Sequence, residues 1–187
     1  MTESRTATPL RRPSGRPADG EFAAYAKADI DQVRGDDAIA ALTSQARDVV
    51  TLLEPLQESR VSGLTYAPDK WTLKEVVGHL ADDERIFAYR MLCVARGDPR
   101  PLPGFDERAY TARAAFEGRA LTDLLDEYLS VRRATLAFLH GLPPHTWLAR
   151  GEVNGYSATV RGLAFHIAGH ELRHLRALRQ LYLLQGG

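Results

Sequence analysis

The stretch VRGLAFHIAGHELRHLRALRQLYLL, from Val160 to Leu184, decides the fold of this chain. Its apolar residues recur every three or four positions, which is the period of one buried helix face. Two histidines, His170 and His174, occupy that face where the pattern calls for leucine. Four residues advance a helix by about 40° and roughly 6 Å, so both imidazoles can reach one point. A buried ring without a partner costs about 1–3 kcal/mol, and a metal ion would satisfy both rings.

Three further long helices are predicted upstream, over residues 38–54, 71–97 and 121–140. Each carries apolar residues at the helical period, and Thr72 with Glu75 predicts a capping box at the start of the second. The connection from 98 to 120 contains three prolines and is long enough to let the next helix run parallel to the second. The chain is therefore predicted to be all-α, a four-helix bundle with a long crossover between helices 2 and 3.

The shorter segments between these helices are predicted from local signals alone. Residues 21–33 form a short helical stretch, and a short helix is expected around 107–116. A short extended piece is expected at 61–66, and residues 145–158 are predicted to be a polar loop with an Asn154–Gly155 turn. Thr122 is the expected N-cap of the third long helix.

Composition limits the classes of function. The chain has 187 residues, and its 24 basic and 24 acidic residues cancel, so no general attraction to nucleic acid is expected. Residues 1–19 are predicted to be a disordered basic tail, and residues 20–187 one domain. Cys93 is the single cysteine, so no intrachain disulfide is possible. No apolar run is long enough to span a membrane, and a cytoplasmic protein is expected.

The segment His170-Glu171-Leu172-Arg173-His174 matches the HExxH motif of zinc proteases. A protease of that kind needs a third ligand after the motif, and no His, Asp, Glu or Cys follows His174. A di-iron carboxylate bundle is also disfavoured. Glu171 and His174 supply one Glu-x-x-His pair, but the spacing of Glu75 and His79 is one residue too long for the second.

The remaining solution takes the third ligand from upstream. His79 lies in the middle of the second long helix, beside its apolar face, and with His170 and His174 it makes a three-imidazole metal site. Such a site leaves positions open for water or substrate, as catalytic zinc sites do. Glu75 and Asp83, one turn to either side of His79, are candidates to orient its ring or to act as a base.

A further histidine competes for a place in this site. His166 is one turn before His170 on nearly the same line of the last helix. It is a candidate fourth ligand, a group that supports a ligand, or a residue at the rim of the site.

The segments WTLKEVVGHLADDERIFAYR (71–90), GDPRPLPGFDE (97–107) and AGHELRHL (168–175) resemble the DinB-like superfamily of metal-dependent bundles, also called the YfiT type. The resemblance implies an up-down-down-up four-helix bundle, frequent homodimers, and a zinc or nickel ion bound by three histidines. Those histidines match His79, His170 and His174. The superfamily includes transferases that use bacillithiol, mycothiol or glutathione.

The expected function is therefore that of a metal-dependent enzyme. It would be a hydrolase or a thiol-dependent transferase, acting on a small molecule or a low-molecular-weight thiol. The alternative is a non-catalytic, dimeric, stress-related binding protein in which the metal is structural.

Overall fold

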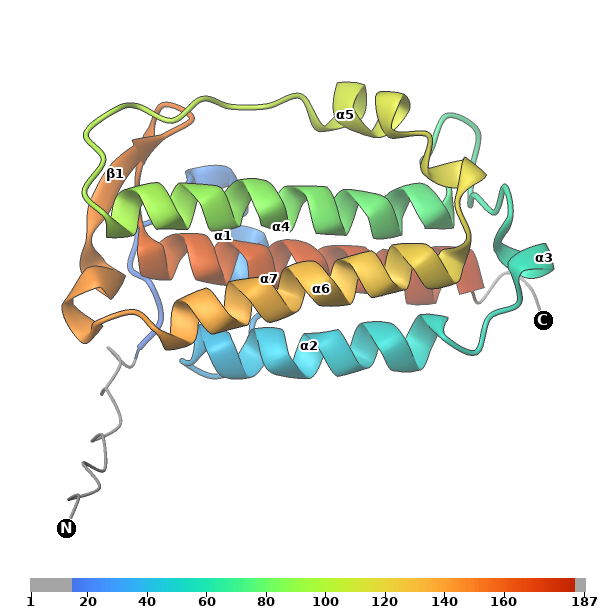
Figure 1. Ribbon diagram of the computed structural model, residues 1–187, viewed down its shortest axis with the longest axis horizontal. Helices are drawn as coiled ribbons and strands as arrows, with labels where there is room; N and C mark the ends of the chain where they lie inside the picture. The colour runs from blue at the N-terminus through green and yellow to red at the C-terminus, as the bar shows by residue number, and fades with distance from the viewer. Residues whose placement is uncertain (1–14, 184–187) are drawn as a thin grey trace, which may run out of the picture.

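Four long helices run alongside one another in the computed structural model, which describes residues 15–183 (Figure 1). They are α2 (Ala38–Leu53), α4 (Leu73–Ala95), α6 (Leu121–His140) and α7 (Val160–Ala177). The shorter elements are η1 (Ala24–Ala26), α1 (Lys27–Ile30), α3 (Glu58–Val61), α5 (Glu107–Ala114), η2 (Phe116–Gly118), η3 (Pro144–Leu148), β1 (Arg150–Val153), β2 (Tyr156–Thr159) and the π-helical η4 (Leu178–Leu183). None of the helices in residues 15–183 is long and apolar enough to cross a membrane.

The order and direction of the four helices confirm the predicted bundle. In Figure 1, α2 and α7 run one way along the bundle, and α4 and α6 run the other way. Helix α4 packs against both α6 and α7, and α2 packs against the same two helices. The parallel pair α4 and α6 is joined by the long crossover, which carries α5 along the outside of the bundle. The topology is therefore up-down-down-up.

The N-terminal segment is described only in part. Residues 1–14 of the predicted basic tail lie outside the described residues. Just after them, Arg16 donates hydrogen bonds to the carbonyl oxygens of Ile30, Val33 and Gly35. These bonds tie the start of the described chain to the end of α1 and to the segment that follows it.

Helix starts were predicted well where a side chain caps them. The capping box of α4 is confirmed, since the Glu75 amide donates to Thr72 Oγ1 and the Thr72 amide donates to Glu75 Oε2. The prediction for α6 was wrong, because Ala120 is its N-cap and no side chain caps it. Thr122 lies inside the helix, whose start depends on the end of the crossover rather than on a local capping signal.

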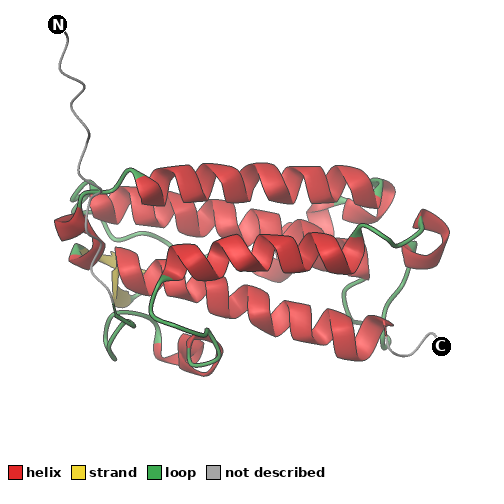
Figure 2. Cartoon of the chain, turned by 90° about the horizontal axis from the view of Figure 1, so that it is seen from below, coloured by secondary structure: helices red, strands yellow, loops and turns green. Residues whose placement is uncertain are grey.

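Two of the short segments differ from the prediction. Residues 61–66 are not extended, because α3 ends at Val61 and turns follow it. The expected polar loop over 145–158 instead contains a β-hairpin (Figure 2), with the predicted Asn154–Gly155 turn at its tip. Leu102 of the crossover bridges to Val153 of this hairpin, so a contact distant in sequence helps to hold the strands in place.

A polar layer crosses the core and divides it in two. One apolar cluster, which includes Phe87 and Leu163, extends toward the hairpin, and the other, which includes Val49 and Leu175, fills the opposite end. Between them, every long helix contributes buried polar side chains: Gln45, His79, Asp83, Glu84, Arg132, His170 and Glu171. Burying so many polar groups costs free energy unless each is paired, so this layer is where function is expected.

Close contact between α1 and α7 depends on Gly169. A Cβ added at Gly169 would lie 2.6 Å from the backbone carbon of Asp29 and 2.7 Å from the Ile30 nitrogen. We expect Gly169→Ala to lower the free energy of unfolding by about 2–3 kcal/mol, because backbone cannot yield as a side chain can. Urea unfolding checks this. Gly118→Ala is the matched control, since nothing lies within 4 Å of a Cβ there; an equal loss in both variants would contradict the packing argument.

Candidate metal centre

Three imidazoles meet in the polar layer. His79 comes from the second turn of α4, and His170 and His174 come from successive turns of α7. His170 Nε2 lies 3.2 Å from His79 Nε2 and 3.1 Å from His174 Nε2, and one ligand atom from each residue lies within 4.8 Å of the others. A tetrahedral zinc ion bound at about 2.0–2.1 Å holds its nitrogens about 3.3 Å apart. The spacing of the three nitrogens therefore fits a shared metal ion.

Burial also prepares these rings to bind a cation. Burial lowers the pKa of His79 to about 4 and that of His174 to about 3, and it holds the pKa of His170 well below its usual value. All three imidazoles are thus neutral at pH 7, which is the form that offers a nitrogen lone pair to a metal. Three neutral nitrogens that face one another leave unused acceptors, and a divalent ion would satisfy them.

The two carboxylates proposed to flank His79 have different positions. Asp83 is buried, and its Oδ2 lies 3.3 Å from His170 Nδ1, so it contacts a ring on the neighbouring helix rather than His79. A proton on His170 Nδ1, the atom beside Asp83, would leave the Nε2 lone pair facing the other two rings. Burial raises the pKa of Asp83 to about 7. Glu75 instead caps α4 through the Thr72 amide.

Two residues missed by the sequence analysis complete the surroundings of the histidines. Glu107, at the start of α5, places its Oε2 4.0 Å from His79 Nε2, and its side chain is half exposed. The Trp71 ring lies 4.6 Å from the His79 ring and 6.4 Å from the His174 ring, measured between centroids. Only the path of the crossover brings Glu107 here, so no spacing in the sequence could have indicated it.

The HExxH glutamate does not take part in this cluster. Glu171 is buried on the other side of α7, where it accepts hydrogen bonds from Tyr128 Oη at 2.9 Å and from Arg132. The same guanidinium pairs with Glu84 at 2.8 Å and donates to the Leu42 carbonyl at 2.8 Å. Glu171 is thus part of a buried ion network, and the zinc protease motif is coincidental.

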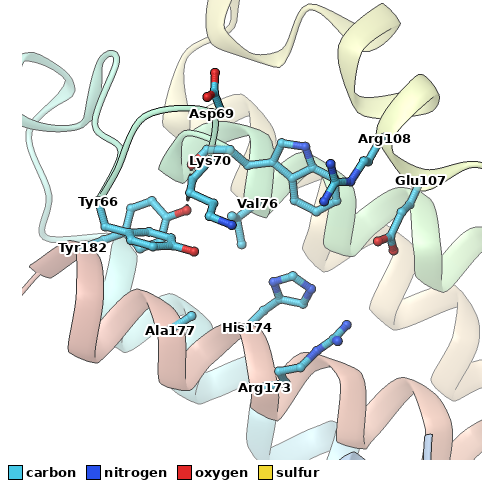
Figure 3. A pocket seen from close by; sticks show the side chains of 11 residues that line it. Tyr66, Asp69, Lys70, Val76, Glu107, Arg108, Arg173, His174, Ala177 and Tyr182 are labelled. Carbon is cyan, nitrogen blue, oxygen red and sulfur yellow. Dashed lines mark hydrogen bonds between the residues drawn. The ribbon is translucent and has the colours of Figure 1, made fainter. Parts of the chain in front are cut away.

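Two cavities adjoin the cluster. The first has a volume of about 420 Å³ and reaches His174, with Tyr66 and Tyr182 toward one end and Glu107 toward the other (Figure 3). The second has a volume of about 270 Å³ and reaches His170. Glu107 and Arg173 line both cavities. A small molecule in either space therefore lies beside the histidines.

His166 lies in the second cavity and outside the three-histidine group. Its ring stacks on Phe87, with a centroid separation of 4.3 Å, and its centroid is 6.4 Å from that of His170. Three roles were considered for His166: a fourth ligand, a group that supports a ligand, or a residue at the rim. Its position in the wall of the adjoining cavity matches that of a residue at the rim of the site. Arg173 also lines this cavity, whereas Arg176 lines a separate groove.

Acid is expected to destabilise the metal-free protein through these histidines. Below pH 6.5 the unfolded chain binds protons that the folded imidazoles do not, so stability falls as the pH falls from about 6.5 to about 4, by up to about 1.4 kcal/mol per unit for each ring. Asp83 acts in the opposite sense, since its raised pKa makes the folded state bind the extra proton between about pH 7 and 4. Comparing variants isolates one ring from these opposing groups.

The variant His174→Leu removes one such ring. With chelator present, its free energy of unfolding should fall by about 2 kcal/mol less than that of the wild type between pH 6.5 and pH 4.5. Urea titration at the two pH values measures this difference. An equal fall in both proteins would show that His174 already takes up its proton in the folded state.

Comparison with known proteins agrees with this architecture. A sequence profile of the DinB superfamily matches residues 41–178. The solved structure of YfiT from Bacillus subtilis superimposes with a TM-score of 0.73 at 18% identity, covering 96% of this chain and 99% of that one. That protein is described as "a probable metal-dependent hydrolase with an unusual four-helix bundle topology". No curated protein matches the chain. Because the profile covers most of its length, this chain belongs to the DinB superfamily.

Proposed function

We propose that this protein is a metal-dependent hydrolase of small molecules, with His79, His170 and His174 as the metal ligands. The observation that carries the proposal is the convergence of three imidazoles, two buried and one half-buried. His170 Nε2 lies 3.2 Å from His79 Nε2 and 3.1 Å from His174 Nε2, and two cavities reach the group. A structural zinc site is normally closed by four protein ligands, whereas three ligands beside a cavity are typical of catalytic sites. The description of YfiT as a probable hydrolase supports the same assignment.

When bound, a divalent ion supplies Lewis acidity, which activates water at neutral pH. Three imidazoles suit zinc, nickel and several other divalent ions, so metal analysis of the purified protein identifies the native ion. Around it, Asp83 holds the His170 ring in the tautomer that leaves Nε2 free. Glu107, 4.0 Å from His79 Nε2, is placed to accept a proton from an attacking water and to return it to the leaving group.

Replacement of this base tests the proposal. We expect Glu107→Gln to lower kcat for a small ester such as p-nitrophenyl acetate by about 10²–10⁴-fold, with unchanged metal content, because general base catalysis contributes that much. Glu152→Gln is the control, since Glu152 is exposed on the hairpin. Full activity in Glu107→Gln would exclude Glu107 as the base.

A second measurement separates hydrolysis from the other functions considered. Azide added to the cobalt-substituted protein should change its visible spectrum if a coordination position is open, and no change would indicate a structural metal. Ester or amide cleavage without added thiol supports the hydrolase. Product formation only when a low-molecular-weight thiol is present would instead identify a thiol-dependent transferase that uses the same histidines.

A further inference from the structure

The smaller cavity beside the metal centre has a chemical character of its own. It has a volume of about 270 Å³, and residues from α4, α7, the crossover and the hairpin line it. The crossover and the hairpin approach each other closely at Gly104, where an added Cβ would lie 2.2 Å from Asn154 Oδ1. Two buried polar groups of this lining stand out. The Arg90 guanidinium has no carboxylate within 4.0 Å, and the His166 Nδ1 atom has no hydrogen-bond partner among the described residues.

The first of these groups is the guanidinium of Arg90. Its residue is only 3% exposed, and its ζ-carbon lies 4.8 Å from the centroid of the Phe87 ring and 5.7 Å from that of Phe105. Its Nη2 donates to the Pro103 carbonyl at 2.7 Å. Among residues 15–183, no carboxylate lies within 4.0 Å of this guanidinium, and a buried cation without an anion is costly.

The second group is the Nδ1 atom of His166. This atom is fully buried, and it has no hydrogen-bond partner among the described residues. The ring is held by Phe87 on its face and by Tyr25 at its edge, with centroid separations of 4.3 Å and 5.8 Å. An unpaired buried nitrogen costs about 1–3 kcal/mol, so a ligand that accepts its hydrogen would recover that free energy.

None of the three carboxylates that line the cavity lies within 4.0 Å of Arg90. Asp29 lies 3.4 Å from Arg173, Asp83 lies 3.3 Å from the His170 ring, and Glu107 lies 4.0 Å from the His79 ring. Arg173 thus has Asp29 as an ion-pair partner, whereas Arg90 attracts Asp83 only from beyond 4.0 Å. Three acidic neighbours disfavour a doubly charged phosphate, and the small volume favours a compact, planar monoanion.

We propose that this cavity binds a carboxylate group of the substrate, with the Arg90 guanidinium and the His166 Nδ1–H as its donors. Charge-assisted hydrogen bonds of this kind are the strong ones, and guanidinium matches carboxylate geometry. The assignment of the anion to a substrate rests on the proposed hydrolase function. Because the His166 and His170 ring centroids are 6.4 Å apart, the bond to be cleaved lies only a few bonds from the carboxylate.

Butyrate and its neutral counterpart butyramide test this cavity in the full chain. In ¹H–¹⁵N NMR spectra, butyrate should shift the signals of residues around Phe87, Arg90 and His166, and butyramide at equal concentration should not. The variant Arg90→Met should weaken butyrate binding at least tenfold, whereas Arg90→Lys should retain part of it. Arg96→Met, which removes an exposed arginine just beyond α4, is the matched control.

Two further arms keep the result decisive. If Arg90→Met does not fold, His166→Phe keeps a ring against Phe87 but removes the nitrogen, and it should weaken butyrate binding severalfold. Butyrate should bind equally with and without chelator. Loss of binding on chelation would place the anion on the metal and overturn the proposal, as would equal shifts with butyramide or unchanged binding in Arg90→Met. A protein that lacks metal but binds butyrate would refute the hydrolase while supporting the cavity.

Discussion

Replacing His79 with alanine is expected to remove both metal binding and turnover. The loss should exceed about 100-fold in metal affinity, because changes to residues that merely support a ligand already cost 10–100-fold. His79 is the one ligand candidate on α4, so its removal leaves only His170 and His174, one turn apart on α7. Two imidazoles on a single helix cannot enclose an ion as three do. Metal analysis and a competitive chelator titration measure the effect.

Two variants bracket this result. His145→Ala removes an exposed histidine of η3 and should leave metal content unchanged. Asp83→Asn, which weakens the contact with His170 Nδ1, should lower metal affinity by about 10–100-fold, less than loss of a ligand. Circular dichroism shows whether each variant is folded. A folded His79→Ala protein with full metal content would refute the assignment of His79 as a ligand.

The second large effect is expected at Arg132. Its side chain is 1% exposed and pairs with two buried carboxylates, Glu84 and Glu171, at 2.8 and 2.5 Å. Arg132→Met keeps the volume but leaves both carboxylates without their cation. Breaking a buried pair in this way costs about 3–5 kcal/mol, so we expect a loss of that size in the free energy of unfolding.

The adjacent arginine supplies the matched control. Arg133 is exposed and bonds only to Ser130 among the described residues, so Arg133→Met should change stability by less than about 0.5 kcal/mol. A double-mutant cycle with Glu84→Gln should recover part of the loss, because one uncompensated charge is removed. If Arg132→Met were as stable as Arg133→Met, the network would not contribute to stability. Unfolding in urea gives all of these values.

Most of the fold could be predicted from local sequence signals. The long helices could be predicted because apolar residues repeat at the helical period. The start of α4 just after Thr72 could be predicted because a capping box needs only two residues three positions apart. The hairpin was missed for the opposite reason. Its strands have four residues each, and the bridge between Leu102 and Val153 joins segments distant in the chain.

The same division holds for the candidate site. The places of His170 and His174 on one face followed from their spacing, and the structure brings both to His79. The partners of these rings did not follow from spacing. Asp83 was expected beside His79, which shares its helix, but it contacts His170 across the helix interface. Glu107 reaches the rings only because the crossover passes over them.

The amino-acid sequence by itself determined the helices, their buried faces and the histidines that those faces carry. Those features depend on rotation per residue along one helix, which is constant. The tertiary structure decided which charged groups meet across helices. It joined Arg132 to Glu84 and Glu171, turned Asp83 toward His170, and left Arg90 facing a cavity without a carboxylate partner among the described residues. Such contacts depend on how helices rotate and where loops cross, and no spacing within one segment encodes either.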